Sequence, residues 1–209
     1  MHRLSLQPMI QKHLEMNMSS DRVELAPAAG GIRKLALFTA TLLASASLLF
    51  CVQPMIAKMI LPYLGGSASV WNTCMVFFQV MLLGGYGYAH STTVALGARR
   101  QVLLQLGLLA VPLLVLPFVI SEDAVRSLSP EANPTGWLLG LLLTSVGLPF
   151  FVVATTAPLL QMWFAETGHP AGKDPYFLYG ASNFGSIVAL LAYPILIEPN
   201  LRLAHQSVV

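Results

Sequence analysis

The chain has 209 residues, of which 56% are hydrophobic and only 10% are charged, whereas a soluble domain usually carries about a quarter charged residues. Its net charge of +2 is small, and no basic stripe with interleaved aromatic residues occurs, so nucleic acid is not an expected partner. The composition instead indicates a protein whose main partner is the lipid bilayer.

Long apolar runs recur along the chain. Roughly 20 apolar residues in a helix span the ~30 Å hydrocarbon core of a bilayer. We therefore predict an all-α fold, a polytopic transmembrane helix bundle with about five spans. The expected spans are residues 35–59, 70–92, 101–120, 136–164 and 176–197.

The segments outside these spans define the expected domain organisation. Residues 1–34 are mixed in composition and lack periodicity, so we expect a disordered cytoplasmic lead-in before a transmembrane domain over 35–198. Residues 199–209 form a short tail. Within the first span, Pro54 removes a backbone donor and predicts an interruption of the helix.

The basic residues predict the orientation in the membrane. With the amino terminus in the cytoplasm, eight of the 11 Lys and Arg residues fall on the inner side, which is the side that such residues favour. The outer side then receives only Lys58, Arg126 and Arg202.

Two halves of the chain show a weak internal similarity. The first span ends with a proline, several apolar residues and then a polar residue, at Pro54–Lys58. Pro158–Gln161 repeats this pattern in the fourth span. In each half a Gly-rich or Pro-rich turn and a helix that carries an asparagine follow. Three-helix repeats build each six-helix half of major-facilitator transporters, so the pattern predicts a partial half of that kind.

Polar residues inside the spans are candidates for lining a substrate path. Asn72, Gln79 and Tyr86 recur at intervals of seven and therefore share one helix face. Interhelical hydrogen bonding explains such a row without any ligand, and substrate lining is the alternative. For Lys58 the alternatives are a side chain that snorkels to the outer interface and a cation that faces an aqueous cavity. The remaining lining candidates are Gln53, Gln161, Tyr179 and Asn183.

Small residues recur every four positions in two of the predicted spans. Gly136, Gly140 and Thr144 form one row, and Ala181, Gly185 and Ala189 form the other. Such rows let helix backbones approach closely in a membrane, so both are predicted helix-packing surfaces.

The motifs of common enzymes do not occur in the chain. There is no glycine-rich nucleotide-binding motif, no H-E-x-x-H and no cysteine spacing of a metal site, so we expect no catalytic residues, no metal and no cofactor. Asp and Glu are missing from the interior of every predicted span, although proton-driven pumps usually place a carboxylate there.

Several uninterrupted words point to a known family. FCVQPMIAKMILP (50–62), LGGS (64–67), VWNTCMVFFQ (70–79), APLLQMWF (157–164) and DPYFLYGASNFGS (174–186) resemble the membrane part of bacterial proteins described as fused major-facilitator/spermidine-synthase-like. The resemblance covers about residues 35–207. It implies a multi-pass protein of the bacterial inner membrane.

The sequence also departs from that family. Its members usually continue through further membrane helices into a Rossmann-like aminopropyltransferase domain, whereas this sequence stops at Val209 without one. We therefore expect a separately encoded synthase domain, or a truncated or split gene, and assign no aminopropyl-transfer chemistry to these residues.

Three roles follow from the sequence. The first is a non-enzymatic transport-like or membrane-anchoring module of a spermidine-synthase-like system, with polyamines or other small solutes as the expected cargo. The second is a structural accessory subunit with a membrane-protein partner. The third is the membrane half of a split aminopropyltransferase.

Overall fold

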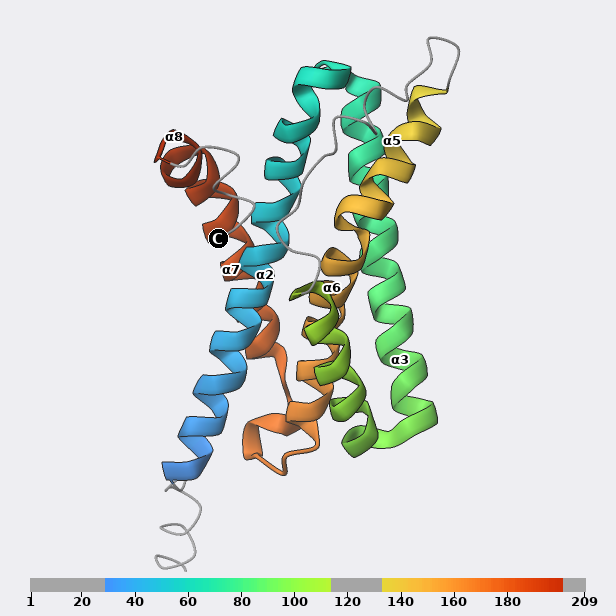
Figure 1. Cartoon of the computed structure of the whole chain (residues 1–209). Helices are drawn as coiled ribbons and strands as arrows, with labels where there is room; N and C mark the ends of the chain where they lie inside the picture. The colour runs from blue at the N-terminus through green and yellow to red at the C-terminus, as the bar shows by residue number, and fades with distance from the viewer. Residues whose placement is uncertain (1–28, 114–132, 201–209) are drawn as a thin grey trace, which may run out of the picture. The chain divides into compact units, whose positions relative to one another are not determined.

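The computed structural model describes residues 29–113 and 133–200, and within those ranges every regular element is helical (Figure 1). The all-α prediction is therefore confirmed for the described part of the chain. The α-helices are α2 (Ala29–Leu64), α3 (Ala68–Leu113), α5 (Pro134–Leu142), α6 (Leu148–Ala165), α7 (Tyr176–Ala192) and α8 (Glu198–Asn200). Two π-helical turns, η1 (Leu143–Gly147) and η3 (Tyr193–Ile197), and a 3₁₀ turn, η2 (Pro170–Lys173), complete the elements.

The chain divides into two units, residues 1–37 and 38–209. The described part of the first unit is residues 29–37, which are helical, so residues 29–34 of the predicted disordered lead-in already belong to α2. The rest of that lead-in and positions 201–209 of the predicted tail lie outside the described residues. All contacts discussed below belong to the second unit.

Four helical stretches of the described part are long and apolar enough to cross a membrane. Their lengths of 35, 45, 32 and 25 residues exceed the roughly 20 residues that the hydrocarbon core requires. They indicate a membrane location, and we call them the spanning helices: Gly30–Leu64, Ala68–Pro112, Pro134–Ala165 and Tyr176–Asn200.

The second spanning helix contains two of the five predicted spans, because α3 turns back on itself at Gly97. This residue has φ 68° and ψ 164°, a backbone conformation that side chains disfavour and glycine adopts freely. Residues 68–96 and 98–113 form the two arms of the resulting hairpin (Figure 1). They correspond to the predicted spans 70–92 and 101–120, and positions 114–120 lie outside the described residues.

Prolines act differently from the sequence prediction. α2 continues through Pro54 and Pro62, so the predicted interruption at Pro54 is not observed. A single missing donor is tolerated within a long helix whose other turns stay hydrogen-bonded. The helical geometry changes instead just before Pro149 and Pro199. In a regular α-helix, each proline ring would collide with the carbonyl group four residues earlier. The π-helical turns η1 and η3 contain these two carbonyl groups.

The α5–η1–α6 stretch forms the centre of the second unit. Of its most apolar 18 residues, 56% are buried, whereas the corresponding shares are 11% for α3 and 17% for the α7–α8 stretch. Aromatic packing joins it to α3, where the ring centres of Phe78 and Phe150 lie 4.8 Å apart. α2 adds Met55, Ile56 and Ile60 to the same core.

α2 and α7 approach each other closely at Gly185. A Cβ atom at this position would lie 2.5 Å from the carbonyl oxygen of Leu43, so only glycine fits there. The Ser47 hydroxyl donates to the Gly185 carbonyl at 3.1 Å, which fixes the same crossing. Within the predicted packing row, Gly185 and Ala189 are buried and Ala181 is half-buried.

The row Gly136, Gly140 and Thr144 lies on an exposed face of α5 and η1. A Cβ atom at either glycine would meet no described atom within 4 Å. The Thr144 hydroxyl donates to the carbonyls of its own helix, at Gly140 and Leu141. The described part of the chain therefore makes no helix contact at this row.

We expect Gly185→Ala to lower the free energy of unfolding by about 1–3 kcal/mol, because the new methyl group would push α7 away from the α2 backbone. Gly180→Ala on the same helix is the matched control, since open space surrounds that position and alanine favours a helix. Thermal unfolding of the purified protein in detergent measures both. Equal stability of the two variants would contradict the close crossing.

Candidate functional site

Lys58 forms an ion pair near one end of the bundle. Its ammonium group contacts the Glu198 carboxylate, which joins α2 to α8, and lies 6.0 Å from the centre of the Tyr193 ring. The Lys58 and Glu198 side chains are 35% and 42% exposed, so water still reaches both charges. Lys58 thus pairs with an acidic group of the protein itself, at the point where two spanning helices end.

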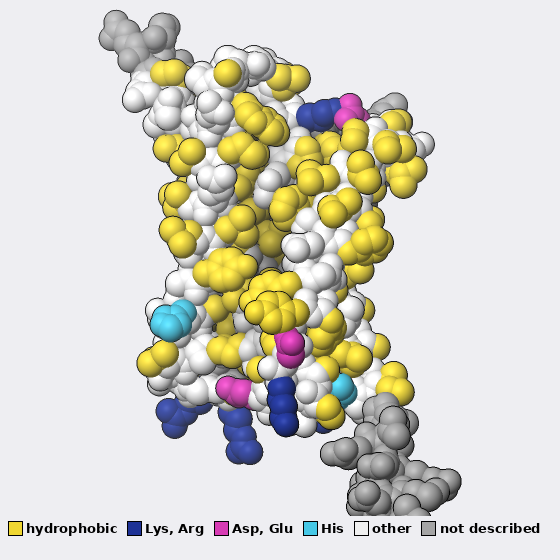
Figure 2. Space-filling view, turned by 180° about the vertical axis from the view of Figure 1, so that it is seen from behind, with side chains coloured by type: hydrophobic (Ala, Val, Ile, Leu, Met, Phe, Trp, Pro, Cys, Tyr) yellow, Lys and Arg dark blue, Asp and Glu magenta, His cyan; other side chains and the backbone are white. Residues whose placement is uncertain are grey.

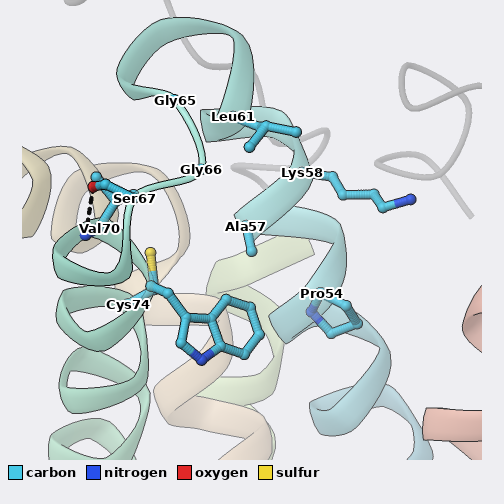
Figure 3. A pocket seen from close by; sticks show the side chains of 10 residues that line it. Pro54, Ala57, Lys58, Leu61, Gly65, Gly66, Ser67, Val70 and Cys74 are labelled. Carbon is cyan, nitrogen blue, oxygen red and sulfur yellow. Dashed lines mark hydrogen bonds between the residues drawn. The ribbon is translucent and has the colours of Figure 1, made fainter.

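A hollow of about 330 Å³ lies beside Lys58, under the turn between α2 and α3. Its lining is mostly apolar, and the Lys58 side chain extends away from the wall formed by Ser67, Val70 and Cys74 (Figure 3). The Ser67 hydroxyl accepts from the Val70 amide at 3.4 Å at the start of α3. The residues around the hollow are Pro54, Ala57, Lys58, Leu61, Gly65, Gly66, Ser67, Val70, Trp71 and Cys74.

The other predicted lining residues do not gather around this hollow. Asn72, Gln79 and Tyr86 lie on the exposed face of α3, opposite its buried side. Tyr179 and Asn183 are exposed on α7, whereas Gln53 and Gln161 are half-buried. Of the eight residues predicted to line a substrate path, Lys58 borders this hollow and the other seven do not.

A buried polar cluster was missed by the sequence analysis. Gln101 is fully buried, and its amide nitrogen donates to the hydroxyls of Thr92 and Thr93 at 2.8 and 2.9 Å. Its amide oxygen accepts from the Trp163 indole at 2.9 Å. This cluster, which we call the Gln101 clasp, joins both arms of α3 to α6 beside the Gly97 corner.

A second glutamine lies one turn further along the same arm. Gln105 is 3% exposed, and its amide nitrogen donates to the Thr155 hydroxyl of α6 at 2.8 Å. Gln101 and Gln105 interrupt an apolar run at a spacing of four, which is the signal that sequence reasoning could have used.

Among the residues of the second unit that the structure describes, charged side chains lie near its ends. Figure 2 shows Lys, Arg, Asp and Glu near both ends of one face and mostly hydrophobic side chains between them. Arg99 borders a shallow hollow of about 280 Å³ together with Glu166, while Lys58 and Glu198 meet at the opposite end of the hairpin arm. This separation agrees with the predicted sides of Arg99 and Lys58; which side faces the cytoplasm stays a prediction.

The cysteines and acidic residues of the described part form no group of three that could hold a metal ion. Cys74 is buried and Cys51 is half-buried, both as free thiols in apolar surroundings.

Searches with protein-family models, against curated proteins and against solved structures found no match to this chain. The resemblance to the fused major-facilitator/spermidine-synthase-like proteins consequently stays a prediction from the sequence.

We expect Gln101→Leu to lower the free energy of unfolding by about 1–3 kcal/mol, because the Trp163 indole would lose its acceptor in a buried site. Gln161→Leu on α6 is the control, since that amide forms no hydrogen bond within the described part, and it should change stability by less than about 0.5 kcal/mol. Thermal unfolding in detergent compares the two, and a neutral Gln101→Leu would contradict the role of the clasp.

A double-mutant cycle tests the ion pair. Lys58→Met and Glu198→Gln should couple by about 0.2–1 kcal/mol, a small value because both side chains are partly in water. High salt should reduce this coupling. Strictly additive effects, or no recovery on exchanging the two charges, would show that the contact does not contribute to stability.

Proposed function

We propose that this protein is a non-enzymatic, membrane-anchoring helical module that assembles with further transmembrane helices. The observation that carries the proposal is the row of Asn72, Gln79 and Tyr86 on the exposed face of a spanning helix. We call this row the α3 polar face.

Lipid chains cannot hydrogen-bond an amide. Polar side chains within membrane-spanning segments therefore face protein or water rather than hydrocarbon. Asn72 and Gln79 have no side-chain hydrogen bond to any described residue, and their face points away from the buried Cys74 and Phe78. Covering the α3 polar face with a helix that offers its own hydrogen-bonding groups satisfies both amides, at about 0.6–2 kcal/mol per contact.

The core of the second unit is complete without this face. Phe78 and Phe150 are buried beneath it, and the Gln101 clasp holds the hairpin to α6. The α3 polar face therefore contributes little to folding of the unit itself. This separation of roles favours an assembly surface over a structural one.

The sequence resemblance suggests where such an assembly would operate. It supports a proposal that the module sits in a bacterial inner membrane, with its amino terminus in the cytoplasm, and serves a spermidine-synthase-like system. In that case the partner helices would belong to the chain that carries the synthase domain, which is the split aminopropyltransferase of the sequence analysis.

A transport-like role is the second candidate, and the hollow beside Lys58 is the observation that favours it. Glu198 is the one acidic residue in the described spanning helices that could attract a polyamine at this end, but it is paired with Lys58. A cationic solute would have to displace that ammonium group. The missing polar lining around the hollow makes this role the weaker proposal.

Spin labels on α3 distinguish the two roles in native membranes. We would label Asn72→Cys and Gln79→Cys, with Val80→Cys as the matched lipid-facing control because it is 55% exposed and lies about 100° around the helix from Gln79. Cys51 and Cys74 are replaced by alanine in this background. Collision rates with oxygen and with a water-soluble nickel chelate then report the surroundings of each label.

For the assembly role we expect low collision rates with both reagents at 72 and 79, and a high oxygen rate at 80. A high nickel rate at 72 and 79 would instead reveal a water-filled path and support the transport-like role. High oxygen rates at all three positions would overturn both. As an independent measurement, Asn72→Leu with Gln79→Leu should dissociate the native complex on a non-denaturing gel without lowering the melting temperature of the isolated chain.

A further inference from the structure

Two buried polar atoms form no hydrogen bond with any described residue: the Tyr88 hydroxyl oxygen and the Gln105 side-chain oxygen. Gln105 already uses its amide nitrogen on Thr155, so its oxygen is the remaining polar atom of a 3% exposed side chain. Buried polar atoms in folded proteins nearly always have a partner, which is either protein or an ordered water molecule. Each of these two atoms therefore requires a partner of its own.

The register of the α3 hairpin brings the two atoms to the same level. Thr92 and Gln101 are hydrogen-bonded across the hairpin at 2.8 Å. Tyr88 lies four residues before Thr92, and Gln105 lies four residues after Gln101, so both are one helical turn further from the Gly97 corner. Residues four apart share a helix face, so Tyr88 and Gln105 lie at about the same level of the hairpin, each on the face that carries a member of the Thr92–Gln101 pair.

Both residues also face the same part of α6. The Tyr88 ring lies 5.8 Å from the Phe151 ring, and the Gln105 amide is bonded to Thr155, four residues later on α6. Gly85 allows this approach, because a Cβ atom there would lie 3.2 Å from the backbone of Ala154 and Thr155. Tyr88 and Gln105 thus both lie at the junction where the two arms of α3 pack against the middle of α6.

We propose that this junction binds a single water molecule between Tyr88 and Gln105. The phenol is a donor and the amide oxygen is an acceptor, and water can accept from the first and donate to the second. Tyr88, Gln105, Phe151 and Thr155 are all uncharged, so the junction offers no charge to compensate a cation in an apolar interior. The ligand class is therefore a small neutral molecule with both donor and acceptor capacity.

The direction in which Tyr88→Phe shifts the melting temperature separates this proposal from its alternative. If a water molecule bridges the pair, Tyr88→Phe removes one of its partners and should lower the melting temperature by about 2–4 °C. If the hydroxyl is buried without any partner, the same substitution removes an unsatisfied group and should leave the melting temperature unchanged or raise it. Tyr63→Phe, at an exposed tyrosine of α2, is the matched control and should have no effect.

Two further measurements make the test independent of a general loss of packing. In a Gln105→Met background, Tyr88→Phe should cause no additional loss, because the two side chains communicate only through the water. Infrared spectra of the purified protein in detergent should show a buried-water stretching band that shifts in H₂¹⁸O, persists in Tyr63→Phe and disappears in Tyr88→Phe. An additive cycle, or a wild-type spectrum without that band, would overturn the proposal.

Discussion

The structure depends on one constraint: a polar group that leaves water must find a partner inside the protein. Within the spanning helices and the two arms of α3 the backbone meets this constraint along its own axis, because each amide bonds a carbonyl about one turn earlier. This requirement explains why every regular element of residues 29–113 and 133–200 is helical. It also explains why the backbone before Pro149 and Pro199 forms π-helical turns, which keep it hydrogen-bonded, instead of leaving the helix.

Side chains meet the same constraint in two ways, and one group of amides leaves it open. The Gln101 clasp saturates a buried amide with two hydroxyls and an indole, and so closes the α3 hairpin onto α6. Lys58 and Glu198 stay at the end of the spanning helices, where water reaches both. The amides of the α3 polar face have no described partner, which is the physical basis for placing another helix against them.

This distribution separates folding from function. The apolar core draws aliphatic and aromatic side chains from α2, α3 and the α5–η1–α6 stretch, and the Gln101 clasp adds hydrogen bonds between α3 and α6. Residues that sequence reasoning assigned to a substrate path lie mostly on the outer faces of α3 and α7. An assembled module fits that arrangement better than a self-contained carrier, whose polar residues would converge on one internal cavity.

Much of the fold could be predicted from composition and pattern. The apolar runs predicted the helices, and the observed corner of α3 at Gly97 falls in the gap between the predicted spans 70–92 and 101–120, because run length is a local property of the chain. The candidate site was harder to predict. Spacing placed Asn72, Gln79 and Tyr86 on one face, but spacing alone does not tell which side of a helix its neighbours cover.

The sequence by itself therefore determined the class of the protein and the course of its chain, because hydrophobicity and helical period act over neighbouring residues. Only the tertiary structure decided which polar groups became partners. Lys58 meets Glu198 across 140 positions of sequence, and Gln101 meets Trp163 across 62. Such pairs depend on how the helices pack against each other, and the glycines at 85 and 185 control that packing through backbone contacts that no local pattern encodes.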